Sequence, residues 1–450
     1  MAYIDFLLER FATNRDDDAV AWQDRTVTFG WLLDRIEQWR AQLALERIEP
    51  GTIAGLETDL SPSAIALFLA LVERGCVVVP LTPAVGAKRD EFVDLAQVEA
   101  SLVVDETDHV KVSRLGRVAT AELYRSLRER QHPGLVLFSS GSTGVTKAAV
   151  HDMVPLLEKF QTPKRCFRTL VFLLFDHIGG LNTLLYTLSN GGLVVTVGDR
   201  QPDTVLATIE KYRVELLPTS PTFLNLILLS GAHTRHDLQS LKLITYGTEP
   251  MLDSTLQRFH ALFPSIRLQQ TYGLSEVGIL RSKSKGSDSL WVKIGGEGFE
   301  TRVVEGTLHI KARSAMLGYL NAPSPFTDDG WLDTGDAVEV DGEYIKILGR
   351  KSELINVGGQ KVYPTEVEAI LQAHDKVAEA TVYGEPNPIT GSIVCAQVRP
   401  TVTLAGDAEK QFVADLKRYC RERLLPYQVP VKLRVSTDVQ HTERFKRRRG

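Results

Sequence analysis

The stretch that decides the fold reads LVLFSSGSTGVTK and occupies residues 135–147. Its first four residues are apolar, and they predict a buried strand. The strand runs into a loop whose two glycines let the backbone fold closely around an anion. Five hydroxyl groups and Lys147 supply hydrogen-bond donors there without any negative charge. The stretch predicts a loop that cradles a polyphosphate, although a plain surface turn has a similar composition.

The loop differs from that of the P-loop NTPases. Their motif has four residues between its first glycine and Gly-Lys-Ser/Thr, whereas here Lys147 stands three residues after Gly144. Residues 148–150 predict a second strand, and Asp152 can cap a helix that continues through Glu158. We therefore expect the loop to join two strands.

Outward from this stretch, short apolar runs alternate with amphipathic segments. Residues 193–197, 241–245 and 380–383 predict strands, and residues 202–212 and 250–263 predict helices. This alternation favours α/β layers in which helices cover sheets.

The pattern of predicted elements changes toward the C-terminal end. Residues 296–348 read as short strands with turns at 305–306, 329–330 and 341–342, where glycine in the second position favours tight hairpins. The tail that follows mixes helix and strand, and Pro364 can begin a helix in residues 363–372. We expect an N-terminal domain over residues 1–349, a hinge at 350–352 and a C-terminal domain over 353–450.

The composition is that of an ordinary globular protein of two or three folded units, because 450 residues are 43% hydrophobic and 24% charged. With a net charge of −4, the protein has no overall positive potential that would attract nucleic acid. The N-terminal residues lack the pattern of a secretory signal, and charges interrupt the longest apolar runs, so we expect no membrane span. Cys76, Cys166, Cys395 and Cys420 lack metal-ligand spacing, which favours free, mostly buried thiols in the cytoplasm.

Three further segments carry residue types that suit a nucleotide. In residues 272–276, a ring can stack on a base, a hydroxyl can bond a phosphate and a carboxylate can hold Mg²⁺. The carboxylate of Asp336 can accept two hydrogen bonds from a vicinal diol, and Arg350 can clamp a phosphate or ribose oxygen. Residues 272–276 and the turn that carries Asp336 also have the composition of ordinary turns. Lys351, next to Arg350, and Lys361, in residues 356–368, are also compatible with a solvent-exposed face.

Together these segments resemble, in this order, the superfamily of adenylate-forming enzymes. That superfamily comprises acyl- and aryl-CoA synthetases, adenylation domains that load carrier proteins, and luciferases. The resemblance runs from about Thr28 to Arg449 and is closest to the acyl-CoA ligases. It implies an α/β fold with a large N-terminal domain of layered sheets, a small β-barrel-like part, and a small mobile α+β C-terminal domain.

The resemblance also assigns roles within an ATP site. The glycine-rich loop would wrap the β- and γ-phosphates, residues 247–250 and Tyr272 would hold the adenine, and Asp336 with Arg350 would bind the ribose. Ser275 would contact the α-phosphate, and Glu276 would hold Mg²⁺. The nucleotide-binding residues implied are Ser139, Ser140, Gly141, Ser142, Thr143, Gly144, Lys147, Gly247, Thr248, Glu249, Pro250, Tyr272, Asp336 and Arg350.

The remaining roles concern the acid and the acceptor. His177 would form a gate beside the substrate carboxylate, and Lys446 would bridge that carboxylate and the α-phosphate. Gly358 and Gly359 would line the channel for the pantetheine arm of CoA, with Ser352 as the hinge. Two of these residues have other interpretations, since His177 also suits a packed core and Lys446 a basic surface cluster.

This sequence departs from the family pattern at several positions. Thr146 stands where proline is usual, and Arg444-Phe445 replaces the usual Ser-Gly before the lysine. We expect the acid pocket to draw on Gly179, Gly180, Tyr246, Thr248 and Leu274. Asp176 leaves an amino acid open as substrate, because amino-acid activators hold the α-ammonium with a nearby aspartate.

The resemblance implies that the protein activates a carboxylic acid with ATP and Mg²⁺, releases pyrophosphate and passes the acyl group to CoA. Three alternatives stay open. The acceptor is an acyl carrier protein in the first and an amine in the second. In the third, the chain is a non-catalytic relative that binds adenylates.

Overall fold

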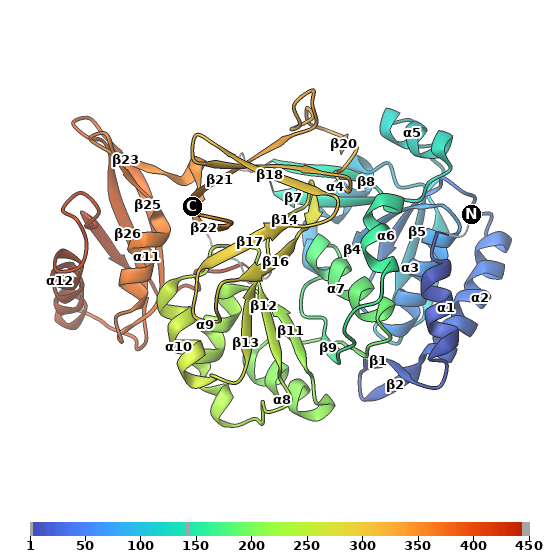
Figure 1. Ribbon diagram of the computed structural model, residues 1–450, viewed down its shortest axis with the longest axis horizontal. Helices are drawn as coiled ribbons and strands as arrows, with labels where there is room; N and C mark the ends of the chain where they lie inside the picture. The colour runs from blue at the N-terminus through green and yellow to red at the C-terminus, as the bar shows by residue number, and fades with distance from the viewer. Residues whose placement is uncertain (1–2, 141–144, 443–450) are drawn as a thin grey trace.

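The computed structural model describes residues 3–140 and 145–442. Two seven-stranded sheets make up most of the N-terminal part, and a two-stranded, a six-stranded and a five-stranded sheet follow them along the chain (Figure 1). The mixed α/β class and the division into a large and a small part agree with the prediction.

The first large sheet contains the glycine-rich loop. Its order is β20-β8-β7-β4-β3-β5-β6, and β7, β4, β3 and β5 run parallel. The strands are β3 (Ile53–Glu57), β4 (Val77–Leu81), β5 (Ala100–Val104), β6 (Val110–Arg114), β7 (Gly134–Ser140), β8 (Thr146–Asp152) and β20 (Gly318–Tyr319). On one face lie α4 (Arg89–Leu95) and α5 (Glu122–Arg130), whose apolar residues share a core with this sheet.

The second large sheet has the order β13-β12-β11-β9-β10-β1-β2. Its strands are β1 (Asp18–Trp22), β2 (Arg25–Thr28), β9 (Thr169–Leu170), β10 (Val194–Val195), β11 (Leu216–Thr219), β12 (Leu243–Tyr246) and β13 (Arg267–Gln270). Helices α8 (Pro202–Tyr212), α9 (Pro221–Ser230) and α10 (Asp253–Leu262) pack on it through a second apolar core.

A group of helices joins the two large sheets. These are α1 (Asp5–Thr13), α2 (Phe29–Leu45), α3 (Pro62–Glu73), α6 (Met153–Gln161) and α7 (Ile178–Ser189). Their apolar residues form one core with residues of both sheets, such as Val78 of the first and Val194 of the second. Burial of this continuous core stabilises the N-terminal part as a unit.

The third sheet is antiparallel and follows the short β14 (Gly273–Leu274) and β15 (Gly278–Ile279) hairpin. Its strands are β16 (Arg281–Ser284), β17 (Trp291–Gly295), β18 (Phe299–Val304), β19 (Thr307–Ala312), β21 (Leu332–Asp341) and β22 (Tyr344–Arg350). Glu305 and Gly306 both have positive φ between β18 and β19, as a tight hairpin turn requires. This is the part predicted to resemble a small barrel, and its strand order is an open path from β16 to β18.

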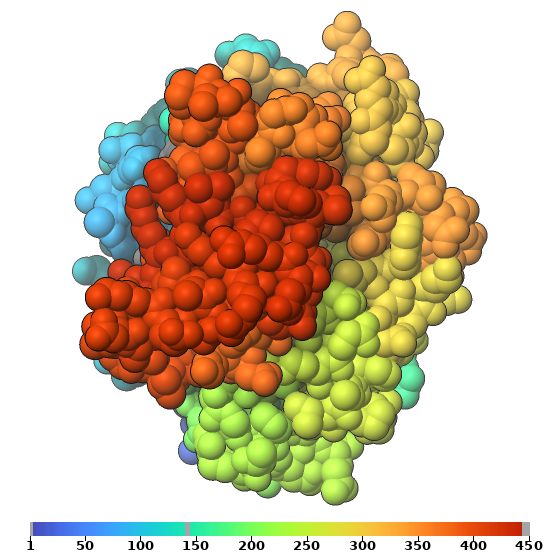
Figure 2. Space-filling model, turned by 90° about the vertical axis from the view of Figure 1, so that its left-hand side faces the viewer, coloured from blue at the N-terminus to red at the C-terminus, as the bar shows by residue number. Residues whose placement is uncertain are grey.

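The C-terminal part has a sheet and an apolar core of its own. It contains η3 (Lys351–Glu353), β23 (Ile355–Val357), β24 (Gln360–Val362), α11 (Pro364–Gln372), β25 (Val377–Asn387), β26 (Gly391–Pro400), α12 (Asp407–Arg421) and β27 (Lys432–Val435). Asn225 Nδ2 on α9 donates to the Ala378 carbonyl on β25 at 3.2 Å, and Thr365 Oγ1 donates to the Leu348 carbonyl at 2.5 Å. Figure 2 shows this part, in orange and red, lying against the green and yellow segments.

Several predicted elements are confirmed. Helix α8 has its predicted bounds, α11 begins at Pro364, and Asp152 caps α6 by accepting the Val154 N–H at 3.0 Å. The loop joins the antiparallel strands β7 and β8. All four cysteines are free, and only Cys166 among them is exposed. No helix in the described ranges is long and apolar enough to cross a membrane.

Several predicted elements were wrong in extent. The strand predicted at residues 241–245 is β12, which runs from Leu243 to Tyr246, and the helix predicted to continue through Glu158 ends at Gln161. Residues 193–197 contribute only two residues to β10, a short strand between β9 and β1. Helix α10 begins at Asp253 and not at residue 250. The Glu249 carboxylate accepts the Thr222 N–H at 2.8 Å, and Thr248 has φ +74°, so this connection is held in a non-helical turn.

Candidate active site

A cavity of about 850 Å³ lies at the carboxyl ends of β7, β11, β12 and β13, and it brings residues of both large sheets, the third sheet and the C-terminal part together. Ligands of parallel α/β sheets commonly bind at this end of the strands. Of the predicted site residues, those that line the cavity are Ser139, Lys147, His177, Gly179, Gly247, Thr248, Leu274, Ser275, Glu276, Arg350 and Ser352.

The glycine-rich loop reaches the cavity through its two ends. Ser139 and Lys147 face each other in the β7–β8 ladder, and both line the cavity. Lys147 Nζ lies 5.1 Å from the centre of the Tyr319 ring, a cation–π arrangement. The predicted phosphate ligands Gly141, Ser142, Thr143 and Gly144 lie outside the described residues, and Ser140 is placed through its backbone pairing with Thr146 in β8.

Asp336 forms a compact hydrogen-bonded group beneath the cavity. The Tyr272 hydroxyl donates to Asp336 Oδ2 at 2.5 Å, and Arg350 Nε pairs with Asp336 Oδ1 at 2.8 Å. Burial raises the pKa of Asp336, while Arg350 and the tyrosine hydroxyl oppose that rise. Asp336 and Tyr272 are nearly buried and do not form the cavity wall, whereas Thr334, Gly335 and Arg350 do. The two predicted residues therefore meet, with their neighbours facing the cavity.

Residues 273–276 line the cavity at the β14–β15 hairpin. Ser275 and Glu276 line it, and Glu276 Oε1 accepts the Tyr319 hydroxyl at 2.5 Å. Behind the segment, His151 on β8 is completely buried, and burial lowers its pKa to about 4 although a contact with the Ser275 backbone favours the charged form. This histidine is therefore neutral at pH 7.

Another part of the cavity wall is formed where β12 ends. Gly247 and Thr248 line the cavity, but Glu249 and Pro250 do not. A Cβ atom at Gly247 would lie 2.6 Å from Thr271 Oγ1 and 2.8 Å from its carbonyl, so only glycine fits there. Glu249 instead accepts hydrogen bonds from the backbone and hydroxyl groups of Thr222 and so fixes the turn.

The N-terminus of α7 forms another wall. His177 is the N-cap residue, and its Nδ1 accepts the Gly179 N–H at 3.0 Å, which turns the other ring edge away from the helix. The histidine lines the cavity and is not a packed core residue. Apolar and polar neighbours share this wall, namely Leu173, Ile178, Gly179, Asn182, Thr183, Leu274 and Ile279.

Gly180 and Tyr246, which were expected in the acid pocket, do not line the cavity. Neither does Asp176, the candidate ligand for an α-ammonium group. A Cβ atom at Gly180 would lie 2.0 Å from the Leu174 carbonyl, so this glycine allows close packing beneath α7. Tyr246 is 1% exposed and belongs to the core of the second sheet. Asp176 is buried and accepts the Thr82 hydroxyl at 3.0 Å, and it is not part of the cavity wall.

The C-terminal part closes one side of the cavity. Arg350, Ser352, Glu353 and Thr442 line it, so the chain near the joint and near its C-terminal end both reach this site. Lys446 lies outside the described residues. Gly358 and Gly359 form the β23–β24 turn with φ of +59° and +88°, and they do not line the cavity in this arrangement.

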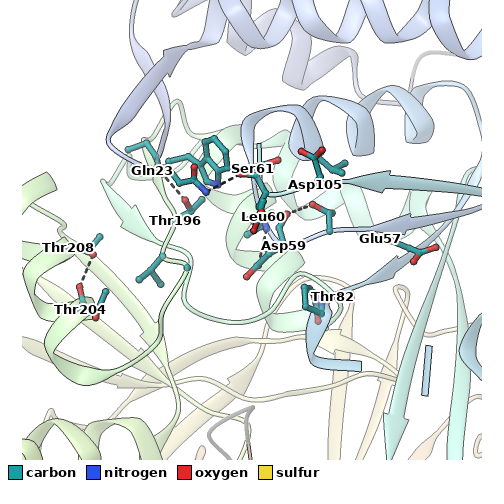
Figure 3. Close-up of a pocket in the computed structure, with 18 of the residues that line it drawn as sticks. Gln23, Glu57, Asp59, Leu60, Ser61, Thr82, Asp105, Thr196, Thr204 and Thr208 are labelled. Atoms are coloured by element: carbon teal, nitrogen blue, oxygen red, sulfur yellow. Dashed lines mark hydrogen bonds between the residues drawn. The ribbon is translucent and has the colours of Figure 1, made fainter. Parts of the chain in front are cut away.

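A second cavity of about 670 Å³ lies at the carboxyl ends of β3, β4 and β5 (Figure 3). Thr82 lines it, and the bond from Thr82 to Asp176 lies between this cavity and the wall that carries His177. Its carboxylates Glu57 and Asp59 pair with Arg89 and Arg200. No sequence motif pointed to this cavity.

Tyr319, Asn182, Glu353 and Thr442 were not identified from the sequence. Helical spacing could have found Asn182, because it lies one turn after Ile178 on α7. Tyr319 gives no local signal, since its contacts to Lys147 and Glu276 join positions far apart in the chain. Among the described residues, no group of three or more His, Cys, Asp or Glu side chains is arranged to hold a metal ion.

Comparison with known proteins finds similarity to CoA ligases over almost the whole chain. A feruloyl-CoA synthase from Amycolatopsis is 26% identical over 92% of this chain and 90% of its own length. A CoA ligase from Rhodococcus jostii, named for a methyl-dioxo-octahydroindenyl propanoyl group, is 26% identical over 92% of this chain and 91% of its own. The structure of an anthranilate CoA ligase with anthranoyl-AMP superposes with a TM-score of 0.82 at 18% identity, covering 99% of this chain and 95% of the other.

Family models match both parts of the chain. The model of the AMP-binding enzymes covers residues 7–320, and that of the AMP-binding enzyme C-terminal domain covers residues 366–446. These matches include most of the residues that surround the cavity. The chain therefore belongs to the AMP-binding enzyme family.

Proposed function

We propose that this protein is an AMP-forming acid–thiol ligase that converts a carboxylic acid into its CoA thioester through an acyl-adenylate. One observation supports this most strongly. The two ends of the glycine-rich loop (Ser139 and Lys147), residues 273–276, Arg350 and Thr442 line one cavity of about 850 Å³, and Arg350 pairs with Asp336 behind its wall. A cavity of that size accommodates a nucleotide together with a small acid.

In the proposed complex the nucleotide lies across this cavity. Ser139 to Lys147 hold the β- and γ-phosphates, Gly247 and Thr248 flank the adenine, and Ser275 contacts the α-phosphate. Asp336 accepts the ribose hydroxyls, with Arg350 maintaining its charge. Tyr272 acts from below by holding the Asp336 carboxylate, because its hydroxyl donates to Oδ2 and its ring is buried.

The first reaction needs no general base. The acid is already ionised at neutral pH, and its oxygen attacks the α-phosphorus as the bond to pyrophosphate breaks. The site must align these groups and neutralise the charge on the transferring phosphoryl group. The hydroxyl groups and Lys147 described above, together with Lys446, supply donors and positive charge for this purpose. A CoA thiolate then attacks the acyl carbon, and AMP leaves.

The residues present fit one Mg²⁺ ion bound together with the nucleotide. Mg²⁺ is usually held by one or two carboxylates and by substrate phosphates. Glu276 is a carboxylate in the cavity wall, and the Tyr319 hydroxyl fixes its Oε1. When bound, the ion would neutralise negative charge on the phosphates. Glu276 would hold it beside Ser275.

We propose a ring-bearing apolar monocarboxylic acid as substrate. Among the charged side chains of the cavity, Lys147, Glu276, Asp333 and Arg350 belong to the segments assigned to the nucleotide, and Glu353 belongs to the C-terminal part. The α7 wall offers Leu173, Ile178 and Ile279 instead, and none of the described residues of this wall is a cation that could bind a second carboxylate. Asp176 is bonded to Thr82 away from this wall, which argues against an α-ammonium group. The relatives and the superposed ligase are named for ring-bearing acids.

We propose CoA as the acceptor, in line with the names of the relatives. In this proposal residues 353–450 form the small domain, and the chain turns at residues 350–352 after the first reaction. That turn brings Gly358 and Gly359 to the site to line the pantetheine channel. A cytoplasmic location follows from this CoA-dependent chemistry and from the free thiols.

The decisive test is acid-dependent exchange of radiolabelled pyrophosphate into ATP with a panel of acids, followed by trapping with CoA, a carrier protein or an amine. Exchange with ring-bearing acids and trapping by CoA support the proposal. If only a carrier protein or an amine traps the adenylate, the acceptor is that group and not CoA. If no acid supports exchange, the proposed activation of an acid is refuted.

Lys446→Ala tests the proposed lysine. Loss of one electrostatic contact to a developing charge costs about 10²–10³-fold in rate. We expect that loss in pyrophosphate exchange, while CoA thioester formation from prepared acyl-adenylate is largely spared. Equal losses in the two half-reactions would remove Lys446 from this role.

A further inference from the structure

The Glu379 carboxylate forms an anchor for the C-terminal end of the chain. It lies on β25 with its side chain 8% exposed. Arg399 Nε on β26 donates to its Oε2 at 2.6 Å, and the Gln440 N–H donates to the same oxygen at 3.3 Å. His441 Nδ1 lies 2.7 Å from its Oε1. One buried carboxylate therefore holds two consecutive residues of the tail.

The charges around Glu379 determine which group donates and which accepts in these hydrogen bonds. Burial raises the pKa of Glu379, but the bonds from His441 and Arg399 outweigh it and hold the pKa below its usual range. The carboxylate is therefore ionised and accepts, and the His441 ring must donate from Nδ1. Hydrogen bonds to an ionised, buried acceptor are among the strong ones.

The anchor stands where the two parts of the protein meet. Ala378, the neighbour of Glu379, accepts a hydrogen bond from the buried Asn225 of α9. On the other side, Thr442 directly follows His441 and lines the nucleotide cavity. The same point of β25 thus contacts the N-terminal part and directs the tail toward the cavity.

We propose that Glu379 is a positioning residue for acid activation, which acts by holding Gln440 and His441 so that Thr442 keeps its place in the wall of the nucleotide cavity. This inference rests on the proposed function, because Lys446 follows Thr442 by four residues. The proposed role of that lysine therefore depends on how residues 440 and 441 are held. The second reaction, in which the small domain turns, does not use this arrangement.

The test compares two half-reactions in the full-length protein. His441→Ala should lower the kcat of acid-dependent pyrophosphate exchange by about 10-fold and Glu379→Gln by up to about 10²-fold, since small misplacement of a reacting group costs this much. KM for ATP and thioester formation from prepared acyl-adenylate should change little. His441→Arg should restore exchange, because a guanidinium can donate to the same carboxylate.

Glu385→Gln is the matched control, because Glu385 is a carboxylate on the same strand that pairs with Lys432 at the surface. It should leave both half-reactions unchanged. Glu379→Gln also disturbs Arg399, so His441→Ala decides the matter if the glutamine variant fails to fold.

The outcomes separate this inference from the proposed function. Absence of exchange in the wild-type protein would refute the proposed function itself. Normal exchange in His441→Ala, with Lys446→Ala strongly impaired, would overturn the anchor alone. Equal loss in both half-reactions would also overturn it, because a general structural defect predicts that result. In Lys446→Ala, adding His441→Ala should cause no further loss of exchange.

Discussion

At the scale of single residues, the proposed role of Asp336 in binding the ribose predicts a lower pH limit for ATP binding. The carboxylate must be ionised to accept hydrogen bonds from the ribose diol. Burial raises its pKa and Arg350 lowers it, so replacing Arg350 by Met should raise the pKa further. We expect the acid side of the pH profile of kcat/KM for ATP to move to higher pH in Arg350→Met, as measured by pyrophosphate exchange.

The control for this prediction is Arg302→Met. Arg302 stacks on the Trp331 ring at 4.1 Å and does not line the cavity, so its loss should leave the profile in place. A uniform loss of activity at every pH in Arg350→Met would show that Arg350 does not tune Asp336.

Residue-level prediction from the sequence brought residues to one cavity where they belong to the same short segment. Ser275 and Glu276 stand together in one motif, and both line the cavity. It failed where contacts join distant positions, as for Tyr319 with Glu276. It also misjudged Gly180, because its role is close packing against the Leu174 carbonyl, which no local pattern reveals.

At the scale of elements, the joint after β22 should control the second reaction. Proline fixes φ and restricts the residue before it, so Ser352→Pro should limit rotation at residues 350–352. We expect CoA thioester formation to slow more than pyrophosphate exchange, as measured by separate half-reaction assays. Ser352→Ala provides the matched control, since alanine leaves φ free. Equal rates in the proline variant and the wild type would argue against a hinge here.

Elements were predictable where local signals mark their ends. Pro202 opens α8, and Asp152 caps α6. The start of α10 was not predictable, because the bond from Thr222 to Glu249 holds the preceding turn and comes from a different helix. The length of β10 depends on its neighbours β9 and β1, which the sequence pattern does not identify.

At the scale of the whole molecule, His151 should make the fold sensitive to acid. Its pKa is about 4 in the folded protein against 6.5 for a free histidine. Below pH 6.5 the unfolded chain takes up a proton that the folded chain refuses, so stability falls as the pH drops toward 4. At pH 5 this proton uptake lowers the free energy of unfolding by about 2 kcal/mol relative to neutral pH.

His151→Leu removes this titration. The thermal midpoint of the variant should therefore fall less than that of the wild type between pH 7.5 and pH 5, as measured by differential scanning calorimetry. Equal decreases in the two proteins would show that His151 does not take part in the acid response.

Also at this scale, the architecture of layered α/β sheets followed by a small α+β part was predictable, because alternating strands and helices give way to hairpins along the chain. The seating of the C-terminal part was not, since it depends on contacts such as that of Asn225 with Ala378. Such contacts join residues far apart in sequence, and they decide which groups reach the cavity.

The measurement that tests the central claim most directly is a crystal structure of the protein with Mg²⁺ and a non-hydrolysable ATP analogue. We expect the ribose hydroxyls on Asp336, the adenine beside Gly247 and Thr248, and the terminal phosphates within the loop that ends at Lys147. A nucleotide bound away from Asp336, or absent from the 850 Å³ cavity at saturating concentration, would contradict the account.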